Sequence, residues 1–165
     1  MFSINAPVPG RVARIASDLH PSLVGFDRIR EHHSLLVKRF GDPDHVASLQ
    51  HEARRAMGDA PAFEVAVTGV DYFSDPPEGS APVVYLTVES PGLRQIHDRL
   101  VERFGAVDML EGDDYTPHVT LARDGSEADA RRLAEREIEP VTWTVSELQF
   151  WDGTYGESVS TVSLP

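Results

Sequence analysis

The order of hydrophobic and polar residues along the chain predicts two similar series of strands and helices, one in each half. Alternating polarity favours strands, and apolar residues that recur every three to four positions favour helices. Strands are expected at residues 2–6, 27–40, 62–73, 82–89, 116–123, 141–151 and 158–164, and helices at residues 12–19, 45–57, 91–104 and 126–138. Both halves therefore follow the order strand, helix, strand, helix, strand.

The repeated order predicts an α+β fold class within a single domain of 165 residues. We expect a duplicated architecture of two β-α-β-α-β lobes, with pseudo-repeat halves at about residues 1–80 and 81–165. The sheets would contain antiparallel strands and face a central cleft, with the helices outside. A chain of this length can bury a substantial core in such an arrangement.

Each half carries a histidine two residues before a hydroxyl side chain, in a segment that favours a strand. The pairs are His32 with Ser34 and His118 with Thr120, about half a chain length apart. Successive side chains of a strand point to opposite faces, so each histidine is expected to share a face with its hydroxyl. His33 is then expected on the opposite face. Two such strands at a cleft would bring two proton-transferring groups and two hydroxyl donors together.

The composition indicates a globular protein, with 41% hydrophobic residues and no cysteine. No run approaches the roughly 18 apolar residues of a membrane span, and the first residues do not resemble a signal peptide. The absence of cysteine excludes disulfides and thiolate metal sites. A cytoplasmic location is therefore the default expectation, and no membrane partner is expected.

The charge balance is strongly acidic, with 27 Asp and Glu against 15 Lys and Arg and a formal net charge of −12. Lys38 is the only lysine, so nearly every basic residue is an arginine. A surface of this kind is expected in a halophilic protein, because molar salt shortens the reach of self-repulsion. An arginine-biased codon supply is the alternative explanation. The negative charge argues against a groove for long nucleic acid.

The two motifs resemble those of the 2H phosphoesterases, in particular the 2′-5′ RNA ligase-like branch. The resemblance rests on a His-x-Ser/Thr pair in each half, and the segment from Pro117 to Arg123 matches the second motif closely. It implies opening of a 2′,3′-cyclic phosphate to a 2′-phosphate without a metal or other cofactor, and the reverse reaction would be 2′-5′ RNA ligation. The implied partners are RNA ends or small cyclic-phosphate nucleotides, and the protein is expected to be a monomer.

The resemblance also implies roles for individual residues. His32 would be the general acid and His118 the general base, although the near-symmetry of the two motifs leaves the assignment reversible. The hydroxyls of Ser34 and Thr120 would donate to the phosphate oxygens. Arg123 would neutralise phosphate charge. Lys38 shares the face of His32 by strand alternation and is a candidate for the same role, or else a surface lysine at the end of a strand.

Two other functions remain open at this point. One is a non-catalytic protein that binds a nucleotide or an RNA end with the same fold. The other is a metal-dependent hydrolase that uses histidine with the acidic residues at 111–114, although the ligand spacing there is poor. The aromatic residues that could stack on a base are expected to serve the core instead; they are Phe73, Tyr115, Trp151 and Tyr155. The histidines outside the motifs are expected on helix surfaces; they are His20, His45, His51 and His97.

Overall fold

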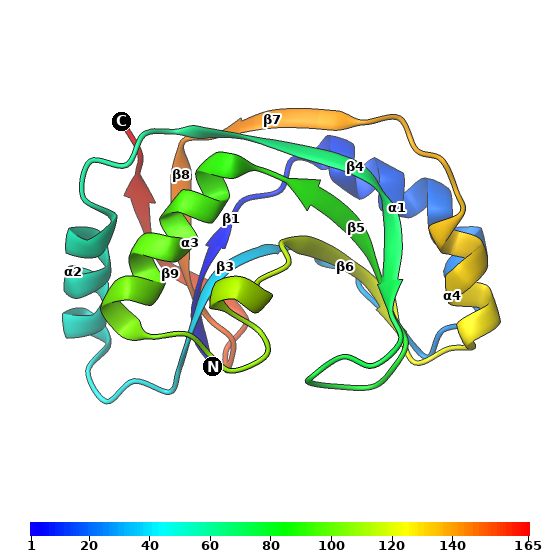
Figure 1. The fold of residues 1–165 in the computed structure, drawn as a ribbon, viewed down its shortest axis with the longest axis horizontal. Helices are drawn as coiled ribbons and strands as arrows, with labels where there is room; N and C mark the ends of the chain where they lie inside the picture. Colours follow the sequence, from blue (N-terminus) through cyan, green and yellow to red (C-terminus); the bar gives the residue numbers. More distant parts are fainter.

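A computed structural model describes all residues from 1 to 165 and contains two antiparallel sheets with helices around them (Figure 1). The elements in chain order are β1 (Phe2–Ala6), α1 (Gly10–Leu23), β2 (Arg28–Ile29), β3 (Leu35–Gly41), α2 (Val46–Met57), β4 (Phe63–Phe73), β5 (Val83–Glu89), α3 (Pro91–Phe104), the 3₁₀ helix η1 (Gly112–Asp114), β6 (His118–Arg123), α4 (Glu127–Ala134), β7 (Val141–Val145), β8 (Glu147–Asp152) and β9 (Glu157–Ser163). The mixed α+β class expected from the sequence is confirmed.

Each sheet is built from both halves of the chain. The first sheet has the strand order β3-β1-β8-β9, and the second has the order β2-β6-β5-β4-β7. Strands β2 and β4 from the first half thus join the second sheet, and β8 and β9 from the second half join the first. The two halves interlock, so the core is one cluster of 33 buried residues.

The chain passes from one sheet to the other at two places where the sequence predicts a continuous strand. The strand expected at residues 141–151 ends at Val145, because β7 pairs with β4 in the second sheet whereas β8 pairs with β1 in the first. The strand expected at residues 27–40 is likewise divided. Strand β2 pairs with β6, β3 pairs with β1, and residues 30–34 cross between the sheets. This crossing segment carries the first His-x-Ser motif.

The helices cover the two ends of the molecule, with α2 and α3 together at one end and α1 and α4 at the other (Figure 1). Helix α3 begins where sequence signals predict it, since Ser90 accepts a hydrogen bond from the backbone N–H of Leu93 and Pro91 occupies the first turn. Helix α4 begins after Ser126, whose side chain accepts a hydrogen bond from the backbone N–H of Asp129, but ends at Ala134, four residues before the expected end. None of the helices combines the length and apolar composition needed to cross a membrane.

Candidate active site

The four motif side chains meet in one pocket of about 270 Å³ between the two sheets. His32 and Ser34 reach it from the crossing segment, and His118 and Thr120 reach it from β6. Other walls come from β1, β3, β8 and the loop before β5. His32 and Ser34 therefore share a surface as expected, but a bend between two sheets places them there instead of strand alternation.

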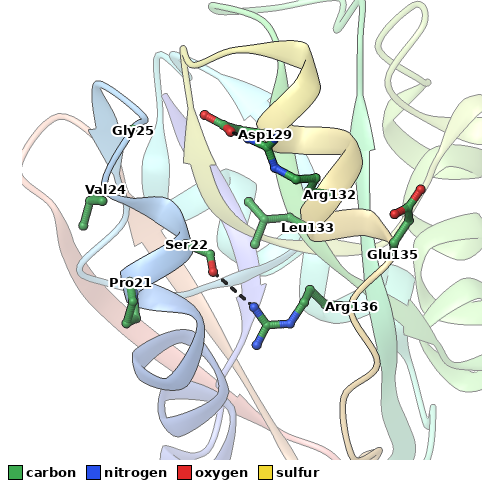
Figure 2. A pocket seen from close by; sticks show the side chains of 9 residues that line it. All are labelled: Pro21, Ser22, Val24, Gly25, Asp129, Arg132, Leu133, Glu135 and Arg136. Carbon is green, nitrogen blue, oxygen red and sulfur yellow. Dashed lines mark hydrogen bonds and ion pairs between the residues drawn. The ribbon is translucent and has the colours of Figure 1, made fainter.

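A larger cavity of about 720 Å³ lies away from these residues, between the end of α1 and helix α4 (Figure 2). Both of its arginines have local partners: Arg132 forms an ion pair with Asp129, and Arg136 donates to Ser22 Oγ at 3.1 Å. No histidine or motif hydroxyl lines it. The smaller pocket between the sheets is therefore the candidate active site.

His118 is held in one orientation by the backbone and by two aromatic rings. Its Nδ1 lies 2.6 Å from the carbonyl oxygen of Thr116, which can only accept a hydrogen, so Nδ1 is the donor. The rings of Phe73 and Tyr85 meet the imidazole edge-on, with centroid distances of 5.4 and 5.3 Å. The lone pair of Nε2 is then the free position of the ring, as a general base requires.

The electrostatic environment keeps His118 neutral. Burial lowers its pKa below the usual 6.5, and the positive charges of Arg39, Arg123 and Arg30 lower it further. The hydrogen bond to the Thr116 carbonyl opposes these effects. Because the net direction is downward, the unprotonated form of His118 dominates at neutral pH.

His32 lies against Trp151 of β8. The two rings are stacked, with centroids 5.4 Å apart and an angle of 10° between their planes. Trp151 is half-buried and lines the pocket, whereas a position in the core was expected. The neighbouring His33 lines a separate cavity with His20, which agrees with its expected orientation away from His32.

The two motif hydroxyls have no hydrogen-bond partner within the protein. Ser34 and Thr120 both line the pocket, and neither side chain takes part in the hydrogen bonds that the structure contains. A hydroxyl that faces a pocket without an internal partner is available to a ligand oxygen.

Three arginines line the same pocket, and none of them forms an ion pair. Arg30 belongs to the crossing segment, Arg39 to β3 and Arg123 to β6. Arg123 donates to the backbone carbonyl of Glu78 at 2.9 Å, and Glu78 is the only acidic residue in the lining. Burial lowers the pKa of both Arg39 and Arg123. A protein with a net charge of −12 thus brings three arginines without ion pairs together in this pocket.

The structure corrects the expected position of Lys38. Its side chain is 2% exposed and lies against Glu111, with Nζ 2.5 Å from Oε1, so it is not among the residues of the pocket. A β-bulge explains the difference: Ile4 pairs with Lys38 but Asn5 pairs with Leu36, which leaves Val37 unpaired. The extra residue reverses the alternation, so Arg39 takes the place in the pocket.

One further expectation, about a histidine, is corrected. His97 is fully buried and accepts a hydrogen bond at Nε2 from the backbone N–H of Gly112, whereas a position on the helix surface was expected. The acidic loop at 111–114 does not gather metal ligands, because Glu111 is paired with Lys38. Nowhere in the chain do three or more His, Cys, Asp or Glu side chains converge to hold a metal ion.

Sequence reasoning alone missed Arg30 and Arg39 as members of the pocket. Arg30 follows the short strand β2, whose partner β6 carries the second motif, and its backbone N–H donates to the Leu121 carbonyl at 2.8 Å. The position of Arg39 depends on the bulge in β3. The available signal was the position of these arginines on either side of the first motif in a chain with few basic residues.

Comparisons with known proteins agree with this architecture. A family model described as the 2′-5′ RNA ligase superfamily matches residues 7–157. A search of curated proteins finds no similar sequence. Among solved structures, TT0787 of Thermus thermophilus is similar over 99% of this chain and 97% of its own, with a TM-score of 0.68 and 17% sequence identity.

E. coli LigT complexed with 3′-AMP is similar over 99% of this chain and 96% of its own, with a TM-score of 0.70 and 15% identity. Structures of LigT complexed with NADP⁺ and with ATP match with TM-scores of 0.68 and 16% identity. A phosphoesterase structure matches with a TM-score of 0.69 and 17% identity, over 99% of this chain and 97% of its own. Identities this low show a shared fold.

Proposed function

Because the chain belongs to the 2′-5′ RNA ligase superfamily, we propose that it opens the 2′,3′-cyclic phosphate at an RNA end to a 2′-phosphate by proton transfer between two histidines. One observation carries the proposal. Two histidines, two hydroxyls without internal partners and three arginines without ion pairs line a single pocket between the sheets. This set combines proton transfer with binding of an anion, which the chemistry of a phosphodiester needs.

In the proposed mechanism His118 is the general base and His32 the general acid. Nε2 of His118 accepts a proton from a water molecule while the water oxygen bonds to phosphorus. The bond between phosphorus and the ribose 3′ oxygen breaks, and His32 gives that oxygen a proton. The product carries a 2′-phosphate and a 3′-hydroxyl, and one proton must return from His118 to His32 before the next cycle. Each positioned proton transfer contributes on the order of 10²–10⁴-fold.

The remaining pocket residues would stabilise the negative charge that develops on the phosphate. Ser34 and Thr120 donate hydrogen bonds to the oxygens that stay on phosphorus, and Arg123 supplies a planar, charged donor. Arg30 and Arg39 add further charge on the same pocket wall. The same groups can act when a 5′-hydroxyl replaces water as the nucleophile: His118 accepts the proton of that hydroxyl, the bond from phosphorus to the 3′ oxygen breaks, His32 protonates the 3′ oxygen, and a 2′-5′ linkage forms.

Nucleotides as substrates have support from the structural neighbours, since LigT is complexed with 3′-AMP, NADP⁺ and ATP. The second candidate is a protein that binds a nucleotide or an RNA end without acting on it. The orientation of His118 favours the enzyme, because its Nδ1–H is fixed by a carbonyl and its Nε2 is left to accept a proton. Simple anion binding would not need that arrangement.

The experiment that tests the proposal is turnover of a nucleoside 2′,3′-cyclic phosphate in molar KCl with EDTA. Wild type, His32→Ala and His118→Ala are compared by chromatography of the products. His33→Ala is the matched control, because it removes an adjacent histidine that lies outside the pocket. We expect a 2′-phosphate product and losses of at least about a hundredfold in both motif variants.

The outcomes separate the candidates. Activity that survives in His118→Ala overturns the two-histidine mechanism. Wild-type protein that binds the nucleotide but does not convert it supports the binding protein. Activity that EDTA abolishes and added metal restores supports a metal-dependent hydrolase.

A further inference from the structure

A second, smaller cavity of about 80 Å³ adjoins the candidate active site. The two share Leu36, Arg39 and His118, so a ligand held at His118 extends directly into the smaller space. The residues that line only this recess are mainly apolar; they are Phe73, Pro77, Met109, Leu110 and Tyr115, together with the polar Asp114 and Thr116. We call this space the apolar recess.

We propose that the apolar recess receives the nucleobase of the nucleotide whose phosphate lies between the two histidines. The proposal rests on the proposed function and names its substrate more closely. In a nucleotide, a single ribose joins the base to the cyclic phosphate. The two cavities are correspondingly close to one another, because Leu36, Arg39 and His118 line both of them. A flat, apolar ring fits walls formed by aromatic and aliphatic side chains.

The charges at the two cavities indicate which end of the nucleotide lies in each cavity. Arg30 and Arg123 line only the phosphate pocket and Arg39 lines both cavities, whereas the carboxylate of Asp114 lines only the recess. Asp114 is exposed and takes part in no ion pair or side-chain hydrogen bond. A carboxylate at this point disfavours a second phosphate and accepts hydrogen bonds from an amino group. The recess is therefore expected to prefer bases with an exocyclic amino group over uracil.

Met109 provides an independent reason to expect a ligand here. Its side chain is 65% exposed, and its backbone has a φ of 65°, in the left-handed region that disfavours residues with a Cβ. The turn is held because the carbonyl of Val107 accepts hydrogen bonds from the backbone of Leu110 and Glu111. A large apolar side chain kept exposed on a strained backbone at the edge of a pocket is explained if it packs on a bound base.

The test compares the four nucleoside 2′,3′-cyclic phosphates with ribose 2,3-cyclic phosphate, which has no base. We expect KM for the baseless compound to be about tenfold higher than for the adenosine compound, the order that stacking on aromatic side chains provides. Uridine is expected to have the highest KM of the four nucleosides. Asp114→Ala should reduce this difference, because it removes the acceptor.

Met109→Gly is the sharpest variant, because glycine suits a φ of 65° and the change removes the side chain without adding backbone strain. It should raise KM for nucleosides several-fold and leave the baseless compound unaffected. Val24→Ala is the control: Val24 is 67% exposed but lies beside the distant cavity at α4 (Figure 2). It should change neither value.

Equal KM values with and without a base overturn the inference while the proposed function stands. If no cyclic phosphate is converted, the proposed function fails, and calorimetric binding of adenosine 2′-phosphate and ribose 2-phosphate then decides on the recess. Tighter binding of the adenosine compound, weakened by Met109→Gly, supports the inference. Equal binding of the two compounds overturns it.

Discussion

Lys38 and Glu111 form a buried ion pair that fixes the backbone of Arg39. Arg39 is the next residue along β3, and it lines the pocket. The two side chains are 2% and 1% exposed, and Nζ lies 2.5 Å from Oε1. Glu111 also accepts hydrogen bonds from the backbone N–H of Arg39 at 2.8 Å and of Val107 at 2.9 Å. Lys38 donates to the carbonyl of Arg39 at 2.7 Å. The pair thus joins β3 to the turn that carries Met109 and holds both backbone groups of Arg39.

Removing one member of the pair is expected to destabilise the fold strongly. Glu111→Gln leaves the ammonium of Lys38 buried without a countercharge, which typically costs about 3–5 kcal/mol. The free energy of unfolding, measured in urea, should fall by roughly that amount. The double variant Lys38→Met with Glu111→Gln should be more stable than Glu111→Gln alone, because no buried charge remains.

The same variants test whether the pair positions Arg39. In the double variant we expect KM for a cyclic phosphate to rise with a smaller change in kcat, since Arg39 binds the anion but transfers no proton. An unchanged KM in a folded double variant would show that the pair serves stability alone. A Glu111→Gln protein that loses less than about 1 kcal/mol would contradict the account of a buried, unscreened pair.

The sequence predicted the elements best where local signals mark their ends. Helix α3 begins at Pro91 and ends at Phe104 as expected, because Ser90 caps it and Gly105 follows it with a positive φ of 82°. The meeting of the two motifs was also predictable, since the repeated order of elements requires two matching segments. These features depend on residues close to one another in the chain.

The features that the sequence did not reveal depend on pairing between distant strands. The alternation of residues 141–151 changes phase at Ser146 and Glu147, but only the pairing with β4 and with β1 shows that β7 and β8 belong to different sheets. The bulge at Val37 is visible only in the register with β1, and it decides whether Lys38 or Arg39 faces the pocket. Trp151 is apolar enough for the core, and only the position of β8 places it against His32.

Gly79 is expected to be essential for the position of Arg123. A Cβ at this residue would collide with Nη1 of Arg123, and the backbone φ of 79° disfavours any residue with a Cβ. In Gly79→Ala the flexible guanidinium is displaced from the pocket, so KM for a cyclic phosphate should rise by roughly ten- to a hundredfold, the loss of one charge-assisted hydrogen bond. Stability should fall by only about 1–2 kcal/mol.

Gly10→Ala is the matched control for this substitution. A Cβ at Gly10 meets nothing within 4 Å, and the residue begins helix α1, far from the pocket lining. Activity of Gly10→Ala should equal that of wild type. A Gly79→Ala enzyme with unchanged KM would show that Arg123 does not contact the phosphate.

The pH dependence of kcat/KM is expected to report the lowered pKa of His118. Burial and the charges of Arg39, Arg123 and Arg30 lower that pKa, so the base stays unprotonated and the acidic limb of the profile lies below pH 6.5. Arg39→Gln removes one positive charge and should move the limb to higher pH. Arg39→Lys keeps the charge and should leave the limb near its wild-type position.

The same shift sets the sign of the pH dependence of stability. Between the lowered pKa and 6.5 the unfolded chain binds a proton at His118 that the folded protein does not, so stability rises with pH across this window. The contribution of His118 to stability is lost as the pH falls from 6.5 toward the lowered pKa. Urea unfolding of wild type and His118→Ala at several pH values checks this contribution. For catalysis, an acidic limb of the kcat/KM profile that does not move in Arg39→Gln would indicate that a group other than His118 controls that profile.

Salt should have opposite effects on stability and on substrate binding. The net charge of −12 implies repulsion between surface carboxylates, and this repulsion is screened as the Debye length falls from about 10 Å at 0.1 M to about 3 Å at 1 M salt. We therefore expect Tm to rise between about 0.1 and about 2 M KCl. Screening also weakens attraction between the three pocket arginines and the phosphate, so KM should rise over the same range.

The two effects distinguish halophilic adaptation from a merely acidic composition. Sucrose is the control, because it favours the compact state without screening charge. If KCl raises Tm well beyond sucrose solutions of matched water activity, surface repulsion limits stability at low salt, as expected for a halophile. If Tm is already at its maximum at about 0.1 M KCl, the surface charges do not destabilise the fold, and the single lysine is better explained by an arginine-biased codon supply. A KM that does not change with salt would contradict an electrostatic role for the arginines, whichever way stability responds.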